Sequence, residues 1–101
     1  MIVETLAGLL DQCYTNSEYF SVNGAAYLSM GDLLRALESL ERALLLDPDN
    51  GSAAVDFAEV LYRQGQVSTA IEVNSQLLSR DDLPEDLRGA ILTRQQRWRR
   101  D

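Results

Sequence analysis

The chain has 101 residues, of which 46% are hydrophobic and 25% charged, a composition ordinary for one globular domain. It contains no histidine, and all nine of its basic residues are arginine, so catalysis by Ser-His, Cys-His or Schiff-base lysine is excluded. The single cysteine, Cys13, excludes an internal disulfide. We therefore expect no enzymatic activity and no cofactor.

The net charge of −7 is distributed unevenly along the chain. Residues 1–87 hold fifteen acids and four arginines, a balance of −11, whereas residues 88–101 hold five arginines and one acid, a balance of +4. Because the long acidic part would repel nucleic acid, we expect no such partner. No apolar run approaches the ~18–20 residues of a membrane span, and no basic residue precedes the apolar N-terminal stretch as in a signal peptide. The compartment stays open: cytoplasmic, or periplasmic if the chain is excised from a larger exported protein.

Hydrophobic periodicity predicts six helices joined by short breaks, and no strands. The clearest helix places Ala36, Leu40 and Ala43 on one face, and the helix before it ends at Gly31. Pro48 separates the two helical pairs, since proline cannot continue a helix. The expected helices cover residues 2–14, 17–30, 33–46, 51–64, 67–80 and 84–99. Because every link is short, neighbouring helices must pack antiparallel.

Two stretches of the chain, residues 17–50 and 51–84, align at a spacing of 34 residues. The identical pairs are Gly31 and Gly65, Ala36 and Ala70, Glu38 and Glu72, Leu44 and Leu78, and Asp47 and Asp81. A period of this length built from helix, turn and helix is the signature of a stacked-helix solenoid. We therefore predict an all-α solenoid of antiparallel helix pairs forming a single domain over residues 1–101. Its parts are an N-terminal helix (1–16), two repeats (17–50 and 51–84) and a capping helix (84–101).

These residues resemble the tetratricopeptide repeat family. The first repeat matches at Phe20, Gly24, Tyr27, Ala36, Leu40, Ala43 and Pro48, and the second at Ala58, Leu61, Ala70 and Leu77. Pro84 lies two residues beyond the family position, and Asn23 and Asn74 stand where the family usually has bulky apolar side chains. The resemblance implies a right-handed superhelix, with Gly24 and Ala58 at close helix contacts. It also implies a non-enzymatic module that presents a concave groove to a peptide or protein partner.

The resemblance places the partner-binding groove on the inner face of the first helix of each repeat. By register, the residues expected there are Glu18, Ser21, Val22, Ala25, Leu28, Ser29, Ser52, Val55, Asp56, Glu59, Tyr62 and Arg63, with Thr93, Gln96 and Arg97 in the last helix. Small residues would leave room for a peptide, and the apolar and charged ones would bind and orient it. The alternative is a solvated face that binds nothing. Paired acids at the helix junctions are explained by capping, so we expect no metal.

Both ends of the chain carry a further expectation. The first helix holds five large apolar residues, more than one helix contact would hide: Ile2, Val3, Leu6, Leu9 and Leu10. Because an exposed patch of this kind generally finds a partner, we expect a homodimer through this helix. In the last helix, a polar outer surface is expected from Arg88, Arg94, Arg97, Arg99 and Arg100.

An alternative function comes from the sequence of residues 82–98. This run is similar to the end of the periplasmic repeat region of some bacterial outer-membrane barrel proteins. The chain would then be a structural periplasmic segment of a larger outer-membrane or secretion-associated protein, in which the helical stack serves assembly.

Overall fold

The computed structural model describes residues 15–100, with side chains to residue 98, and this part of the chain forms five helices and no strand. The helices are α2 (Asn16–Ser29), α3 (Leu33–Leu46), α4 (Gly51–Arg63), α5 (Val67–Leu78) and α6 (Glu85–Arg100). Five of the six predicted helices are thereby confirmed, with ends that differ by two residues or fewer. The sixth, predicted over residues 2–14, lies outside the described residues.

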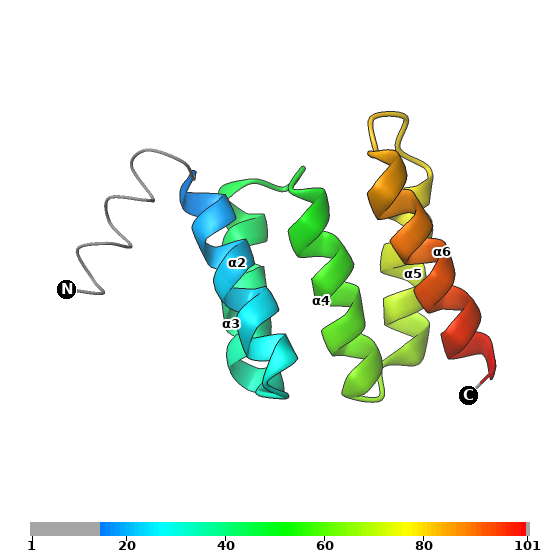
Figure 1. Cartoon of the computed structure of the whole chain (residues 1–101), viewed down its shortest axis with the longest axis horizontal. Coiled ribbons are helices and arrows are strands. Elements are labelled where there is room, and N and C mark those ends of the chain that lie inside the picture. Colours follow the sequence, from blue (N-terminus) through cyan, green and yellow to red (C-terminus); the bar gives the residue numbers. More distant parts are fainter. Residues whose placement is uncertain (1–14, 101) are drawn as a thin grey trace.

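Successive helices run antiparallel and form two layers (Figure 1). In one layer α2, α4 and α6 lie side by side, and α3 and α5 lie behind them. Each repeat is a helix pair, α2 on α3 and α4 on α5, while α4 also packs on α2 and α3, and α6 on α4 and α5. We call the exposed side of the α2–α4–α6 layer the inner face and that of the α3–α5 layer the outer face.

Gly31 and Gly65 form equivalent turns, one in each repeat. Gly31 and Gly65 have φ angles of +79° and +89°, in the left-handed region that glycine adopts at little cost. In both turns the N–H of the following residue donates to the carbonyl five residues earlier at 2.9 Å: Asp32 to Tyr27, and Gln66 to Leu61. The 34-residue register of the sequence therefore reappears in the backbone hydrogen bonds.

Polar side chains begin the helices at the predicted breaks. Thr15 and Glu18 form a capping box at the start of α2: the Glu18 N–H donates to Thr15 Oγ1 at 3.1 Å, and the Thr15 N–H to Glu18 Oε2 at 3.3 Å. Asn50 caps α4, and its Nδ2 donates to Ser17 Oγ at 2.9 Å. The Ser17 hydroxyl donates in turn to the Ala43 carbonyl at 2.8 Å. This chain of hydrogen bonds fixes the start of α2, the end of α3 and the start of α4 relative to one another.

The core lies between the two layers and uses the predicted apolar positions. Residues that are fully buried at these positions include Ala36, Leu40, Ala43, Ala58 and Ala70. The predicted close contact at Gly24 is confirmed, because a Cβ atom built there would lie 2.5 Å from Cγ of Leu40. A larger side chain therefore does not fit between α2 and α3 at this point.

Asn74 of α5 is one of the two departures from the repeat pattern. Its side chain is buried, with 1% exposed, and among the described residues its Nδ2 has no hydrogen-bond partner. A buried polar atom without a partner costs about 1–3 kcal/mol of stability. The packing of the second repeat is weaker at this position than an apolar side chain would make it.

Candidate binding surface

Most of the residues that the sequence predicted for a groove are accessible from solvent. The exposed ones are Glu18, Val22, Ser29, Ser52, Arg63, Thr93, Gln96 and Arg97. Three more are half-buried: Ala25, Asp56 and Tyr62. They belong to α2, α4 and α6, which lie side by side in one layer (Figure 1). The residues predicted for self-association, Ile2, Val3, Leu6, Leu9 and Leu10, lie outside the described part of the chain.

The other four residues expected in the groove are buried: Ser21, Leu28, Val55 and Glu59. Leu28 belongs to the core cluster that joins α2, α3 and α4, and Val55 to the cluster that joins α4, α5 and α6. They are buried because helices of the inner layer pack on each other as well as on the layer behind. A partner cannot contact these four side chains unless a helix moves.

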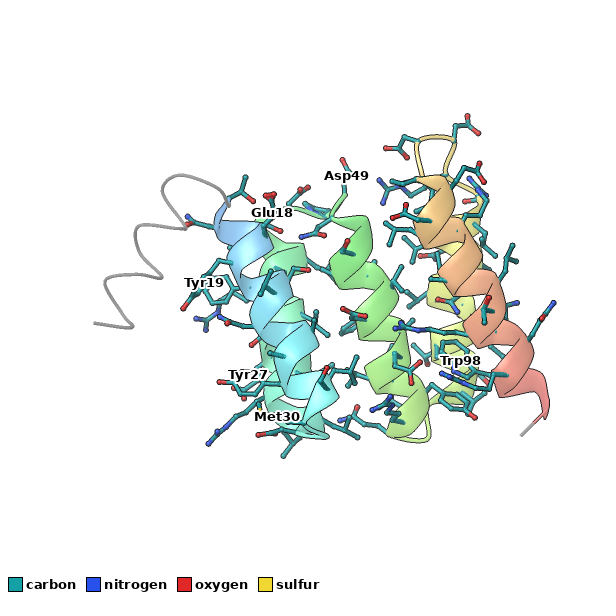
Figure 2. The ribbon with its side chains drawn as sticks, viewed as in Figure 1. Glu18, Tyr19, Tyr27, Met30, Asp49 and Trp98 are labelled. Carbon is teal, nitrogen blue, oxygen red and sulfur yellow. The ribbon has the colours of Figure 1, made fainter. Side chains whose placement is uncertain are left out.

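Glu18 is exposed but already engaged. Figure 2 shows it at the first turn of α2, where its carboxylate accepts from the backbone N–H of Thr15. Because this capping box satisfies an end of the helix, a partner that takes the carboxylate would weaken the cap. The Glu18 carboxylate therefore has a structural role at this end of the inner face.

Glu59 of α4 is the centre of an ion-pair cluster on the inner face. Only 3% of its side chain is exposed, and its Oε2 atom lies 2.8 Å from Nε of Arg63, one turn further along α4. Its Oε1 atom lies 3.4 Å from Nη2 of Arg97 and 3.6 Å from Nε of Arg94, both on α6. A buried carboxylate is tolerated only with partners of this kind. The cluster therefore holds α6 against α4.

Asp56 extends the cluster by one turn of α4. Its Oδ1 atom lies 3.4 Å from Nη1 of Arg94, which also donates to the Val55 carbonyl at 3.2 Å. Burial raises the pKa of the Asp56 carboxyl above its ordinary value, Arg94 opposes that rise, and the neighbouring Glu59 adds to it. Burial is the largest effect, so the Asp56 side chain holds its proton to a higher pH than a solvated aspartate.

The acid–arginine cluster comprises Asp56, Glu59, Arg63, Arg94 and Arg97. With both acids ionised it carries one excess positive charge on a chain whose net charge is −7. Arg63 and Arg97 keep 45% and 59% of their side chains exposed. A guanidinium group has five N–H donors, so both can bind an anionic group from solution while they hold Glu59. The arrangement is suited to binding a carboxylate or a phosphate.

Sequence reasoning missed the role of Arg94. It assigned this residue to a polar outer surface of the last helix, but Arg94 is half-buried against Asp56. The signal that could have found it is spacing: the acids 56 and 59 and the arginines 94 and 97 are each three residues apart, on two helices that run in the same direction (Figure 1). Equal spacing on parallel neighbours brings the arginines opposite the acids, so that Arg94 contacts both acids and Arg97 contacts Glu59.

Arg88 also departs from the expected outer surface. Its Nη1 and Nη2 atoms donate to the carbonyls of Leu78 and Arg80, each at 3.0 Å. These carbonyls lie at the last residue of α5 and two residues beyond it, so Arg88 ties the last helix to the helix before it. The side chains of Arg99 and Arg100 lie outside the described residues.

Tyr62, expected to offer an apolar contact, is stacked on the last helix. Its ring lies 4.7 Å from that of Trp98 with an angle of 11° between the planes. Trp98 is buried, and Figure 2 shows it on the lower part of α6. The stack and the acid–arginine cluster are two separate attachments of α6 to α4.

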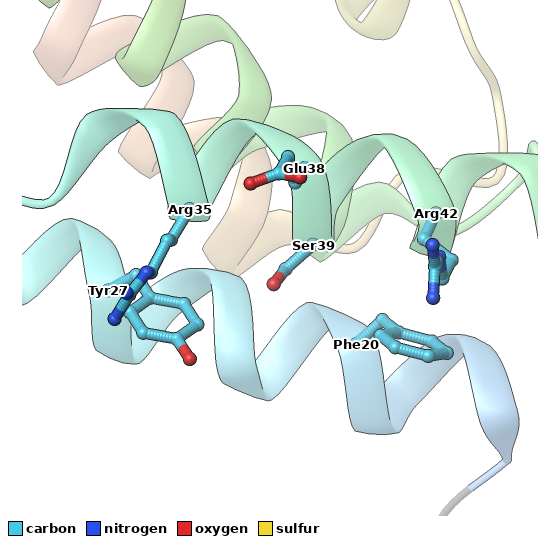
Figure 3. A pocket seen from close by; sticks show the side chains of 6 residues that line it. All are labelled: Phe20, Tyr27, Arg35, Glu38, Ser39 and Arg42. Carbon is cyan, nitrogen blue, oxygen red and sulfur yellow. The ribbon is translucent and has the colours of Figure 1, made fainter.

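A separate cavity of about 280 Å³ lies between α2 and α3 (Figure 3). Its lining residues are Phe20, Tyr27, Arg35, Glu38, Ser39 and Arg42. The Arg42 guanidinium carbon lies 5.3 Å from the centre of the Phe20 ring, a cation–π distance. Sequence reasoning did not predict this cavity, since Phe20 and Tyr27 were assigned to packing.

Among the paired acids at the helix junctions, Asp82 forms an ion pair with an arginine. Arg80 binds Asp82 with Nε 3.1 Å from Oδ1, and this hydrogen bond holds the pKa of the Asp82 carboxyl below its ordinary value. Within residues 15–98, no three potential metal-ligating side chains come together.

None of the helices in the described part of the chain is both long and apolar enough to cross a membrane. A family model for the tetratricopeptide repeat matches residues 27–91, more than half of the chain. Repeats of this family generally mediate protein–protein interaction and are typically non-enzymatic. Searches of curated proteins and of solved structures gave no match.

Proposed function

The chain belongs to the tetratricopeptide repeat family, and we propose that it is a protein-binding module that takes an acidic peptide segment on its inner face. The observation that carries the proposal is the acid–arginine cluster. Arg63 and Arg97 each hold the buried Glu59 carboxylate and still keep about half of their side chains exposed. Such half-exposed guanidinium groups, held in place by a buried acid, are preorganised to bind carboxylates.

The surroundings of the cluster support an extended ligand. Arg63 Nη1 lies 3.5 Å from the Leu28 carbonyl, so its guanidinium stands between α2 and α4. Beside it on α2, Ala25 and Ser29 are small, and Val22 offers an apolar contact with 50% of its surface exposed. A peptide lying across these helices would place an acidic group over Arg63 and Arg97 and a small apolar group over Val22.

The net charge of the chain does not decide this interaction. At physiological ionic strength the Debye length is about 8 Å, so distant acids on the other helices are largely screened from a bound ligand. The local excess of arginine within the cluster therefore sets the preference. The net charge of −7 slows the approach of an acidic peptide at low salt.

A displayed library of random decapeptides selected on the folded chain tests the proposal. The selected peptides should be enriched in Asp and Glu, and their affinity should fall at least tenfold for Arg97→Glu. The matched control is Arg35→Glu on α3, which removes an arginine that is 67% exposed and lies outside the cluster. It should leave the affinity within about twofold.

Two results would refute this function. Selected peptides without acidic enrichment would show that the cluster does not attract the ligand. Acidic peptides that bind Arg97→Glu as well as the wild-type chain would show that they bind elsewhere.

A further inference from the structure

The outer face contains an apolar cleft between α3 and α5. Both helices pack on α4 but make few contacts with each other, so the side chains of α4 form the floor between them. One cavity of about 390 Å³ lies over Leu44, Leu45 and Phe57, and a second of about 340 Å³ over Leu44, Phe57 and Val73. The two cavities share Leu44 and Phe57, so they adjoin each other, and we call them together the outer groove.

The lining of the outer groove is apolar and open to solvent. Of the apolar residues that line it, Leu45 is 82% exposed, while Leu44, Phe57 and Val73 are half-buried. A single exposed leucine needs no explanation. Here the exposed Leu45 adjoins half-buried apolar side chains in a groove, and contiguous apolar patches of this kind mark interaction sites.

The rim of this groove is acidic. Glu41 lines the first cavity and Asp49 the second, and the exposed Glu72 lies one turn before Gln76, which lines the groove from α5. The one arginine in the lining, Arg80, is paired with Asp82 at 3.1 Å and donates to the Asp49 carbonyl at 3.2 Å. The charge that remains around the groove is therefore negative. This sign is opposite to that of the acid–arginine cluster on the inner face.

We propose that the outer groove binds a basic amphipathic helix of a partner protein. The residues of α3 and α5 that line the groove lie in the last turns of these helices, from Glu41 and Val73 onward, so a partner helix would contact it over about two turns. Its apolar side chains, spaced at i, i+4 and i+7, would enter between Leu45 and Val73 over Phe57. Arginine or lysine residues beside this stripe would meet Glu41 and Glu72. The interaction is independent of the peptide proposed for the inner face.

A displayed library of 18-residue helices tests the proposal. The library presents a fixed apolar stripe with random charged residues on either side, and it is selected on the full chain. The selected helices should be rich in Arg and Lys, and their affinity should fall at least tenfold for Leu45→Arg. Leu45 is 82% exposed, so this variant should keep the helical circular dichroism of the wild type. Glu41→Lys should weaken the same helices and reduce the dependence of their affinity on salt.

The matched control is Val22→Arg, which places the same new charge at an exposed apolar site on the inner face. Val22→Arg should change the affinity for the selected helices by no more than about twofold. This result would show that the helices bind the outer groove and not the inner face. Helices with acidic flanks, or helices that bind Leu45→Arg as well as the wild type, would overturn the proposal. A chain that selects no helix but forms a homodimer dissociated by Leu45→Arg would also overturn it, and would assign the groove to a second copy.

Discussion

The same substitution, glycine to alanine, should have opposite effects at two helical positions of this chain. Gly24 lies in α2, where an added Cβ would be 2.5 Å from both Cγ and Cδ2 of Leu40. Gly89 lies in α6, is exposed, and a Cβ added there would meet no atom within 4 Å. The pair therefore separates the intrinsic effect of alanine on a helix from the effect of contact with a neighbour.

The magnitudes follow from these distances. Replacing glycine by alanine in a helix interior stabilises it by about 0.5–1 kcal/mol, which is the whole effect expected for Gly89→Ala. At Gly24 the new methyl group would lie about 1 Å inside the optimal carbon–carbon separation. Leu40 is fully buried and cannot turn away into solvent. Overpacking of this kind costs about 1–3 kcal/mol, so Gly24→Ala should destabilise the chain by about 1–2 kcal/mol net.

Urea unfolding followed by circular dichroism measures both variants. For a domain of this size, the expected change at Gly24 corresponds to a fall in Tm of roughly 5–10 °C. In a Leu40→Val background, which lacks the leucine Cδ atoms, the penalty of Gly24→Ala should shrink, because the two residues are in direct contact. If Gly24→Ala stabilises the chain as much as Gly89→Ala does, the contact between α2 and α3 is not close and the packing described above is wrong.

Three further predictions concern the acid–arginine cluster and the N-terminal segment. Glu59→Gln should lower the free energy of unfolding by about 1–3 kcal/mol in a urea titration. The loss should be smaller than for a fully buried ion pair, because two of the arginines that contact Glu59 stay half-exposed. As a control, Glu72→Gln at an exposed site should change the free energy of unfolding by less than about 0.5 kcal/mol. The pKa of Asp56 is raised on folding, so the folded chain binds its proton more tightly, and this residue's contribution to stability should fall as pH rises from the ordinary pKa of aspartate through the raised one. The free energy of unfolding should therefore depend on pH with a different slope in the wild type and in Asp56→Asn over that acid range. Equal slopes would contradict the raised pKa of this carboxyl. If residues 2–10 mediate a homodimer, light scattering should show a dimer that Leu6→Glu converts to a monomer; a wild-type chain that is monomeric at high concentration would refute that interface.

The repeat register could be predicted from the sequence because it depends on local rules. Gly31 and Gly65 each follow a helix and adopt a left-handed backbone conformation, which only glycine adopts at little cost. The distance between them in the sequence therefore gives the length of the repeat. The placement of Gly24 at a close contact rests instead on the resemblance to the repeat family. Glycine in a helix interior does not predict such a contact by itself, because Gly89 of α6 has open space around it. The two turn glycines, in contrast, require no knowledge of distant parts of the chain.

The burial of Glu59 could not be predicted in the same way. A glutamate followed four residues later by an arginine on one helix normally indicates a solvated i,i+4 pair. Glu59 is buried here because Arg94 and Arg97 of α6, more than thirty residues later, form ion pairs with its carboxylate. Helical periodicity places Leu44 on the core face with Leu40 and Ala43, but it does not show that Leu45 lines a groove. Both features depend on how neighbouring helices are placed, which is tertiary information.

The two proposed binding surfaces share one helix, and this determines which substitutions can separate them. Asp56 and Glu59 of α4 point toward α6 and the inner face, while Phe57, between them in sequence, forms the floor of the outer groove. A substitution in the buried part of α4, such as one at Val60, would shift both surfaces together and would not distinguish them. Substitutions at the exposed rims, Arg97 on one side and Leu45 on the other, change one surface and leave the backbone of α4 in place. Binding of an acidic peptide and of a basic helix should therefore be lost independently at the rims and together in the core of α4. That pattern would be expected only if both ligands use the same two-layer stack from opposite sides.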